Sequence, residues 1–196
     1  MQGPDAVTAF VLAGGKSTRM GSDKAFMVLE GQSLLRRALQ TLRSVSHDVM
    51  IVGSGSKFSE YAPVVEDIFE QRGPLGGIHA ALMATTTDLN LILAVDLPFV
   101  EEGFLEFLLR AAQQTDAMAV VPKAAGGWQP LCAVYRKRFG NAAEQALKLG
   151  RNKIDLLFGP VPVLTISEQE IVGAGFSPHI FRNINTREEL EEADQA

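Results

Sequence analysis

The 196-residue chain is long enough to bury one core of ordinary size and falls within the range of a single globular domain. Hydrophobic residues make up 46% and charged residues 21%, close to the averages of water-soluble domains, which excludes a disordered or collagen-like chain. The net charge of -5 gives no general attraction to polyphosphates, so we expect neither nucleic acid nor a membrane as a partner.

The first residues, the apolar runs and the single cysteine of the chain bear on its cellular compartment. The opening residues MQGPDAVTAF lack the basic and apolar regions of a secretory signal, and no apolar run reaches the roughly 20 residues that span a bilayer. Cys132 is the single cysteine, which excludes an intramolecular disulfide. It lies in the apolar run PLCAVY and is predicted to be a buried structural thiol rather than a nucleophile. We therefore expect a cytoplasmic protein.

The first half of the chain predicts strands that alternate with helices. Val7 to Leu12 is a continuous apolar run ending at two glycines, as in a strand buried on both faces. Ser33 is expected to cap a helix that runs to about Ser44. The remaining predictions are a strand in DVMIVGSG, a short strand at 63–65, a helix at 78–84 and a buried strand at 89–95.

The second half continues this alternation. It predicts helices at 101–114, 138–149, 153–158 and 186–194, and strands at 117–121, 130–135, 161–166 and 180–184. This order is typical of a doubly wound, Rossmann-like α/β fold, in which helices cover both faces of a mostly parallel sheet with room for one antiparallel strand. No interdomain linker is visible, so we expect a single domain over residues 1–196. In such sheets ligands bind outside the carboxyl ends of the strands.

The loop after the first strand lies in VLAGGKSTRMGSDKA. It contains Gly15-Lys16-Ser17, the three residue types that close a phosphate-binding P-loop. The full P-loop pattern needs a glycine where Phe10 stands, and Gly14, Gly15 and Gly21 do not have the spacing of the dinucleotide fingerprint. The sequence therefore excludes both patterns, and the glycine-rich loop needs another explanation.

Glycines and positive charges in this loop predict a site for a triphosphate. Gly14 and Gly15 let the backbone and its N–H groups come close to a ligand. Lys16, Arg19 and Lys24 bring three positive charges within nine residues. The alternative is a solvated turn with incidental charges.

Asp96 follows the apolar run LNLILAV and precedes Leu97-Pro98. A carboxylate at the carboxyl end of a buried strand is well placed to hold Mg²⁺, which takes one or two carboxylates and then substrate phosphates. We expect Asp96 to be the metal ligand. The alternative is an aspartate that caps the turn before Pro98.

Three further polar residues follow predicted strands. Asp67, after PVVE, could accept hydrogen bonds from a base or a ribose, or could cap the following turn. Asn183 and Asn185, in RNINT, could face the metal and the phosphates, although Asn185 could instead cap the last helix.

The histidines and the lone tryptophan are weaker candidates. His47, His79 and His179 are scattered without metal-ligand spacing and are predicted to be structural or surface groups, which argues against zinc. Trp128, in GGWQPL, either lines a substrate pocket or packs in the core.

With these residues assembled, LAGGKSTRMGSDK resembles the signature loop of the MobA-like nucleotidyltransferases, and most of all that of the molybdenum cofactor guanylyltransferases among them. The resemblance covers nearly the whole chain, through GPLGGI after an E-D pair, AVDLPF, QPLCAVY and the closing NINTREEL. It implies an enzyme that transfers GMP from GTP to molybdopterin with Mg²⁺ as cofactor and releases pyrophosphate.

The resemblance also implies roles for individual residues. Leu12, Ala13 and Gly14, with Gly15 in the same loop, would contact the nucleotide. Lys24 would bind the phosphates, and Arg19 would neutralise their charge. Asp67 would take part in nucleotide recognition and Asp96 would hold Mg²⁺, so that the residues expected to act in catalysis are Arg19, Lys24 and Asp96.

Three positions bear on how far the resemblance extends. Gly53 stands where some members have an asparagine that contacts the nucleotide, so that contact is not carried over. Arg187 stands where a proline is usual, which alters the first turn of the helix and no site residue. Gly14 favours guanine, because relatives that transfer cytidylate usually read L-A-A-G.

Other functions stay open at this stage. The same fold could use CTP on the same cofactor or a nucleotide on a sugar phosphate, and a non-catalytic GTP-binding protein or pterin carrier is a further alternative. Loops at 73–77 and 124–129 are candidates for the acceptor site because both are glycine-rich and lie between strands. Carrier or acceptor proteins for the cofactor are candidate partners.

Overall fold

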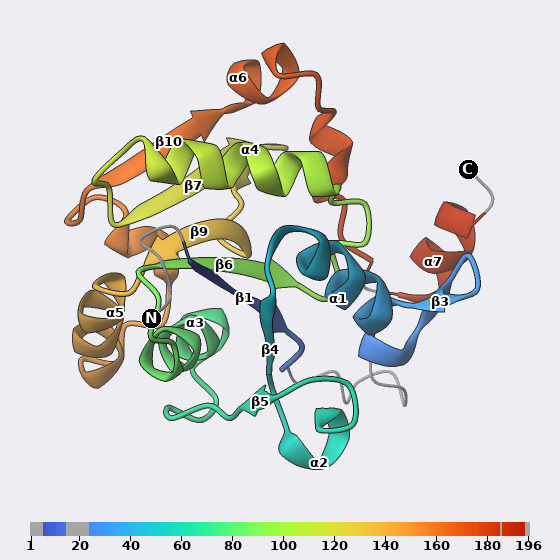
Figure 1. Ribbon diagram of the computed structural model, residues 1–196, viewed down its shortest axis with the longest axis horizontal. Helices are drawn as coiled ribbons and strands as arrows, with labels where there is room; N and C mark the ends of the chain where they lie inside the picture. The colour runs from blue at the N-terminus through green and yellow to red at the C-terminus, as the bar shows by residue number, and fades with distance from the viewer. Residues whose placement is uncertain (1–5, 15–23, 185, 195–196) are drawn as a thin grey trace.

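The computed structural model describes residues 6–14, 24–184 and 186–194, and a single large sheet forms its centre (Figure 1). The strands follow the spatial order β10-β7-β9-β6-β1-β4-β5, and β8 pairs with β7 at one end. Their bounds are β1 (Val7–Leu12), β4 (Asp48–Val52), β5 (Val64–Val65), β6 (Leu89–Ala94), β7 (Ala119–Ala124), β8 (Gly127–Trp128), β9 (Cys132–Arg136) and β10 (Val163–Ser167). The chain crosses over between non-adjacent strands, as expected of a doubly wound fold.

Strand direction confirms the expected mostly parallel sheet. β1 pairs in parallel with β4 and β6, β4 with β5, and β7 with β10. β9 is antiparallel to both of its neighbours, β6 and β7, and is the antiparallel strand that the sequence allowed for. The two-residue β8 adds a third antiparallel pairing to this sheet, with the end of β7.

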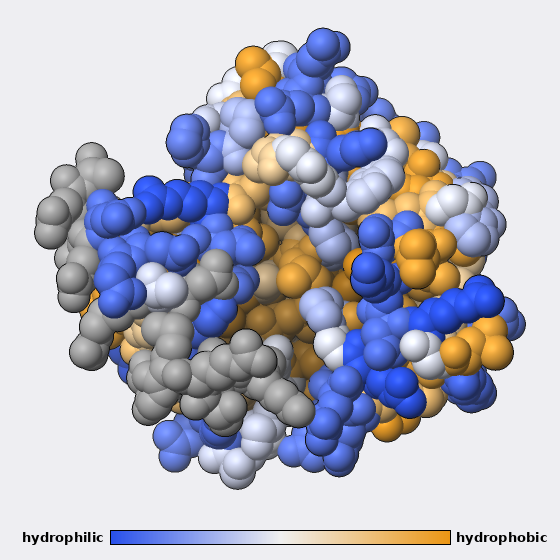
Figure 2. All heavy atoms as spheres, turned by 180° about the vertical axis from the view of Figure 1, so that it is seen from behind, coloured by the Kyte–Doolittle hydropathy of each residue, from blue (hydrophilic) through white to orange (hydrophobic). Residues whose placement is uncertain are grey.

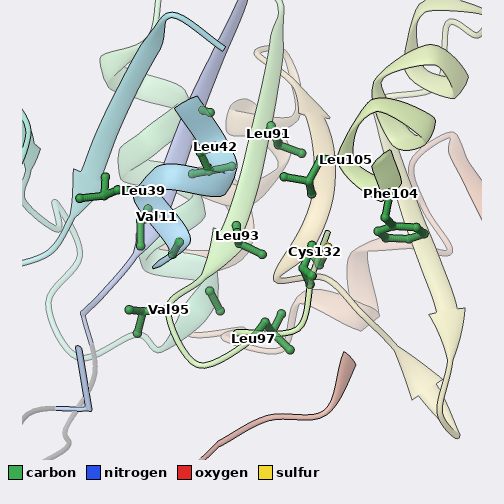
Figure 3. Packing of buried hydrophobic residues seen from close by; sticks show 14 of the residues in the cluster. Val11, Leu39, Leu42, Leu91, Leu93, Val95, Leu97, Phe104, Leu105 and Cys132 are labelled. Carbon is green, nitrogen blue, oxygen red and sulfur yellow. The ribbon is translucent and has the colours of Figure 1, made fainter. Parts of the chain in front are cut away.

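Helices cover both faces of the sheet, which explains the continuous apolar runs of the strands. α1 (Leu34–Val45) and α4 (Glu102–Gln113) pack on one face, and α3 (Pro74–Ala84) and α5 (Phe139–Lys148) on the other. Side chains of β1 alternate between the two layers: Val11 joins the α1/α4 core, whereas Phe10 joins the α3/α5 core. Figure 3 shows Val11, Leu91 and Leu93 of the strands facing Leu39, Leu42 and Leu105 of the helices.

Shorter elements complete the fold at the periphery. They are the 3₁₀ turn η2 (Lys24–Phe26), the hairpin of β2 (Val28–Leu29) and β3 (Gln32–Ser33), α2 (Gly55–Phe58), η3 (Ile154–Leu157), α6 (Glu168–Gly173), η4 (Pro178–Phe181) and α7 (Arg187–Asp194). Figure 1 shows α7 beside the β2–β3 hairpin. Within the described ranges, every helix is too short or too polar to cross a bilayer.

Local sequence accounts for several helix boundaries. The Arg36 amide donates a hydrogen bond to the Ser33 hydroxyl at 3.4 Å, which confirms Ser33 as the cap of α1. α3 begins at Pro74, four residues before the predicted start, because Pro74 has the backbone angle of a first helical residue and Gly73 adopts a φ of 65° before it. The glycine-rich stretch 74–77 is therefore the first turn of a helix and not a loop between strands.

The segment 180–184 was predicted as a last strand, and this prediction is wrong. Residues 178–181 form the 3₁₀ turn η4, which Ser177 caps by accepting a hydrogen bond from the His179 amide at 3.2 Å. Ile180 and Phe181 are buried in the α1/α4 core without pairing in the sheet. Their apolar pattern reflects burial, and Pro178 with the Ser177 cap favours a turn over an extended strand.

Polar residues join the strands at the edge opposite the carboxyl ends. The Thr87 hydroxyl donates to the Thr8 hydroxyl at 2.9 Å, and the Asn90 amide donates to the carbonyl of Thr87 at 3.2 Å and, more weakly, of Tyr135 at 3.4 Å. These side chains are buried, so their hydrogen bonds replace water that the core excludes. They fix β1, β6 and β9 relative to one another.

Candidate active site

The glycine loop leaves the sheet between β4 and β6. The amides of Ala13 and Gly14 both donate to the Val52 carbonyl, at 3.0 and 3.1 Å, and the Val95 amide donates to the Leu12 carbonyl at 3.1 Å. Gly14 is exposed, and its amide is engaged within the fold. Gly15, Lys16 and Arg19 lie outside the described residues.

Lys24 and Asp96, far apart in the chain, lie side by side at the carboxyl edge of the sheet. The Lys24 Nζ is 3.8 Å from the Asp96 Oδ2, and about a quarter of each side chain is exposed (27% and 23%). Asp96 sits in the turn after β6, where the Leu97 amide bonds the Ala94 carbonyl at 3.3 Å. Lys24 comes from η2. The sequence assigned both residues to one phosphate site, and the structure brings them together.

The surroundings of Asp96 disfavour an isolated negative charge. Burial raises the pKa of the Asp96 carboxyl above its ordinary value, and the Lys24 ammonium and hydrogen bonds from Asp96's own backbone and from Lys24 counter only part of that effect. A second cation beside the carboxylate would offset the remaining cost. Asp96 is therefore an electrostatically suitable ligand for a metal ion.

The donor chemistry at Asp96 fits Mg²⁺ better than a transition metal. Among the described residues, no group of three or more histidine, cysteine, aspartate or glutamate side chains is arranged to hold a metal. Mg²⁺ keeps several waters and is bound by one or two carboxylates with substrate phosphates, so a single accessible carboxylate is enough for it.

Asp67 lies two residues beyond β5, beside the same loop. A Cβ placed on Gly77 of α3 would lie 3.7 Å from the Asp67 Oδ1 and 3.3 Å from the Leu12 Cδ2. The missing side chain of Gly77 thus lets α3 approach both Leu12 of β1 and Asp67. Partial burial, and then the negative charge of Glu70, raise the pKa of Asp67.

The RNINT segment reaches the same edge. The Ile184 amide donates to the Asp96 carbonyl at 3.0 Å, which carries the chain past the Lys24–Asp96 pair. Asn183 is exposed next to this contact, and Asn185 lies outside the described residues. Figure 2 shows that the face seen from behind is hollowed in its middle, with apolar residues on the floor and hydrophilic residues along much of the rim.

Two contacts at the site were not foreseen from the sequence. Gly53 follows β4, and a Cβ placed on it would lie 2.8 Å from the Phe58 ring and 3.5 Å from the Gly14 amide nitrogen. Phe58 in turn lies against Phe26, next to Lys24, with the ring centroids 5.8 Å apart. Gly53 could be singled out in the sequence as a glycine directly after a buried strand. Local patterns could not identify the ring that lies against it.

Three further candidates, Cys132, His79 and Trp128, are buried or half-buried. Cys132 is fully buried, and burial raises the pKa of its thiol, which disfavours the thiolate that a nucleophile requires. His79 is buried in α3 with its ring edge-on to Phe69 at 5.1 Å, and its ring nitrogens have no hydrogen-bond partner among the described residues. Trp128 is half-buried and packs against Phe158 at 4.9 Å.

The fold and the site define a class of enzyme. A mostly parallel sheet, a glycine loop after its first strand and a lysine–aspartate pair at the carboxyl edge are the arrangement expected of a nucleotide-binding α/β protein. Residues 9–160 match the family model of the MobA-like NTP transferase domain. The chain belongs to this family of nucleotidyltransferases.

Relatives of known name extend over nearly the whole chain. A molybdenum cofactor guanylyltransferase from Desulfosudis oleivorans is 37% identical over 98% of this chain and 96% of its own length. A probable molybdenum cofactor guanylyltransferase from Clostridium perfringens is 31% identical over 94% of each chain. The crystal structure of molybdopterin-guanine dinucleotide biosynthesis protein A from Archaeoglobus fulgidus superimposes with a TM-score of 0.82, at 27% identity over 96% of this chain and 97% of that one.

The Gly53–Phe58 contact generates a prediction about stability. Gly53→Ala should lower the free energy of unfolding by about 1–3 kcal/mol, because the new methyl group would collide with a ring that is only 1% exposed. Chemical denaturation would measure the change. Gly159→Ala is the matched control, since a Cβ there meets nothing within 4 Å. Equal stability of the two variants would contradict the contact.

Proposed function

We propose that the protein transfers GMP from GTP to molybdopterin, forms the guanine dinucleotide form of the molybdenum cofactor and releases pyrophosphate. The observation that carries the proposal is the Lys24–Asp96 pair beside the glycine loop, in a chain whose relatives are named for guanylyl transfer to the molybdenum cofactor. Leu12, Ala13, Gly14 and Gly15 would contact the nucleotide, and Asp67 would take part in its recognition.

The reaction is an in-line displacement at the α-phosphorus of GTP. An oxygen of the terminal phosphate of molybdopterin forms the new bond to the α-phosphorus, while the bond from the α-phosphorus to the bridging oxygen of the β-phosphate breaks and pyrophosphate leaves with that electron pair. Because a phosphate oxygen is already a competent nucleophile, the protein need not supply a general base.

Charge neutralisation is then the main task of the site. Lys24, which already lies 3.8 Å from Asp96, would bind the phosphates, and Arg19 would neutralise further charge as pyrophosphate departs. Mg²⁺ would bind to Asp96 and supply positive charge to the same phosphates. The positive charges would thereby surround the phosphates where negative charge develops.

Purified protein tests this function directly. It would be incubated with Mg²⁺, molybdopterin and GTP, CTP or ATP in turn, and pyrophosphate release and the dinucleotide product would be measured. We expect product from GTP. Transfer from CTP, transfer of a nucleotide to a hexose 1-phosphate but not to molybdopterin, or tight GTP binding without transfer to any acceptor would each overturn the proposal.

Asp96→Asn should separate activity from stability. We expect turnover to fall by about 100-fold or more, because an amide cannot supply the negative charge that holds the metal. A folded-state pKa raised above the unfolded value means that the ionised Asp96 lowers stability as the pH rises through the folded pKa. The variant, neutral at every pH, should therefore be at least as stable as the wild type at pH 7.

Activity assays and thermal unfolding at several pH values would check both parts of this prediction. Any stability advantage of Asp96→Asn should disappear as the pH falls below the ordinary range of an aspartate. Asp116→Asn, on an exposed side chain, is the control and should change neither quantity. Full activity of Asp96→Asn at saturating Mg²⁺ would refute the role of Asp96.

The acceptor would bind beside the β7–β8 hairpin. β9 separates β6 from β7, so the hairpin lies at the same edge as Asp96, about 10 Å or two strand spacings away. There the half-buried Trp128 ring carries the Lys123 ammonium 5.3 Å from its centroid. An aromatic surface with a positive charge suits the pterin ring and the anionic groups of molybdopterin.

Trp128→Ala should therefore raise the KM for molybdopterin by about tenfold while the dissociation constant of GTP stays the same. Steady-state kinetics with the acceptor varied, and titration with GTP alone, would measure the two quantities. Trp128→Phe keeps an aromatic ring and should lose less. A matching loss of GTP affinity in Trp128→Ala would indicate a general disturbance of the fold and would contradict this placement.

A further inference from the structure

Phe26 joins the Lys24 segment to a distant part of the chain. It is the last residue of η2, and its ring lies near two aromatic rings of the segment after β4, with centroid distances of 5.8 Å to Phe58 and 5.9 Å to Tyr61. Phe26 is 39% exposed, whereas Phe58 is 1% exposed. Phe26 therefore docks from outside onto a ring that belongs to the core.

The two rings that receive Phe26 are firmly held. Phe58 fills the space beside Gly53, where a side chain would collide with its ring. The Tyr61 amide donates to the Phe58 carbonyl at 3.0 Å, and Arg43 of α1 donates to the Tyr61 carbonyl at 3.0 Å. These bonds tie the aromatic pair to α1. Phe58 and Tyr61 thus form a fixed surface next to the glycine loop.

The backbone that carries Lys24 is anchored on its other side by the following residues. The Met27 amide donates to the Lys24 carbonyl at 3.0 Å, and the Leu34 amide, at the start of α1, donates to the Met27 carbonyl at 2.9 Å. Ala25, between Lys24 and Phe26, is fully buried. The turn is consequently held both by hydrogen bonds through Met27 and by the aromatic contact of Phe26.

A lysine has a long, flexible side chain that loses conformational freedom when it is ordered, so the position of its backbone determines how well it holds a charge in place. We propose that Phe26, docked on Phe58 and Tyr61, is a positioning residue that holds Lys24 against Asp96 and against the phosphates of the bound nucleotide. This role rests on the proposed function only in that Lys24 binds nucleotide phosphates. It does not depend on which acceptor receives the nucleotide.

Nucleotide binding and turnover test the role of Phe26. Phe26→Ala should weaken the affinity for Mg-GTP by about tenfold, because the aromatic contact no longer holds the turn. The KM for GTP should rise and kcat should fall, while the KM for molybdopterin stays the same. Phe26→Tyr keeps an aromatic ring on a residue that is 39% exposed, and should retain the wild-type values.

A matched control separates positioning from a general loss of stability. Val28→Ala removes an exposed apolar side chain two residues further along the same segment and should leave the Mg-GTP affinity unchanged. Thermal unfolding of each variant would show that the protein remains folded at the assay temperature. Equal losses of affinity in Val28→Ala and Phe26→Ala would overturn the specific role of Phe26.

A double-mutant cycle with Lys24→Ala provides the decisive comparison. If Phe26 acts through Lys24, then Phe26→Ala should cause no further loss of Mg-GTP affinity in a protein that already lacks the lysine. Additive losses would overturn the proposal and assign Phe26 a separate effect. Because the readout is binding, a wild-type protein that binds Mg-GTP but transfers nothing to molybdopterin would refute the proposed function while the cycle still tests Phe26.

Discussion

The site depends on the in-register pairing of β1 with β6. Leu12 pairs with Ala94, so the two strands end at the same level, and the Val95 amide continues the pairing by bonding the Leu12 carbonyl. This places Gly14 and Asp96, from segments far apart in the chain, at one edge of the sheet. A shift of one residue in this register would reverse which strand side chains face each core. The buried cores therefore fix the distance between the loop and the carboxylate.

The charges of Asp96 and Lys24 are the second constraint on the site. Asp96 is held in a place where burial disfavours its ionised form, and the fold supplies Lys24 as a partial counter-charge. A pair of this kind, about one quarter exposed, adds little to stability by itself. Its value is that an accessible carboxylate and an ammonium face the same small volume. A phosphate with a bound metal ion presents charges of both signs that match this pair.

Sequence patterns predicted the features that depend on local order. The run from Val7 to Leu12 identified β1, the run before Asp96 identified β6, and Ser33 identified the start of α1, because burial and capping leave signals in neighbouring residues. The rule that ligands bind at the carboxyl ends of parallel strands led us to expect Lys24 and Asp96 at the same edge of the sheet, where the structure has them 3.8 Å apart.

The features that sequence patterns missed depend on contacts between distant residues. The docking of Phe26 on Phe58 joins two segments that local patterns treat separately. The apolar pair Ile180–Phe181 gives the same sequence pattern whether it is buried in a strand or in a turn. The predicted roles of Gly15, Lys16 and Arg19 fall outside the described residues, so they stay predictions.

Gly53 shows how such a contact bears on base recognition. Some members of the family have an asparagine there that contacts the nucleotide, but in this chain the Phe58 ring lies 2.8 Å from where a side chain would begin. Under the proposed function, a base would then be recognised by other groups near the glycine loop. Asp67, which like Leu12 lies within 4 Å of a Cβ placed on Gly77, would be a hydrogen-bond acceptor there. Guanine offers an amino group and a ring N–H side by side, which an ionised carboxylate can accept together, whereas cytosine offers an amino group alone. The raised pKa of Asp67 adds a condition to this match, since the carboxyl must be ionised to accept both bonds, and two donors from a bound guanine would themselves favour the ionised form.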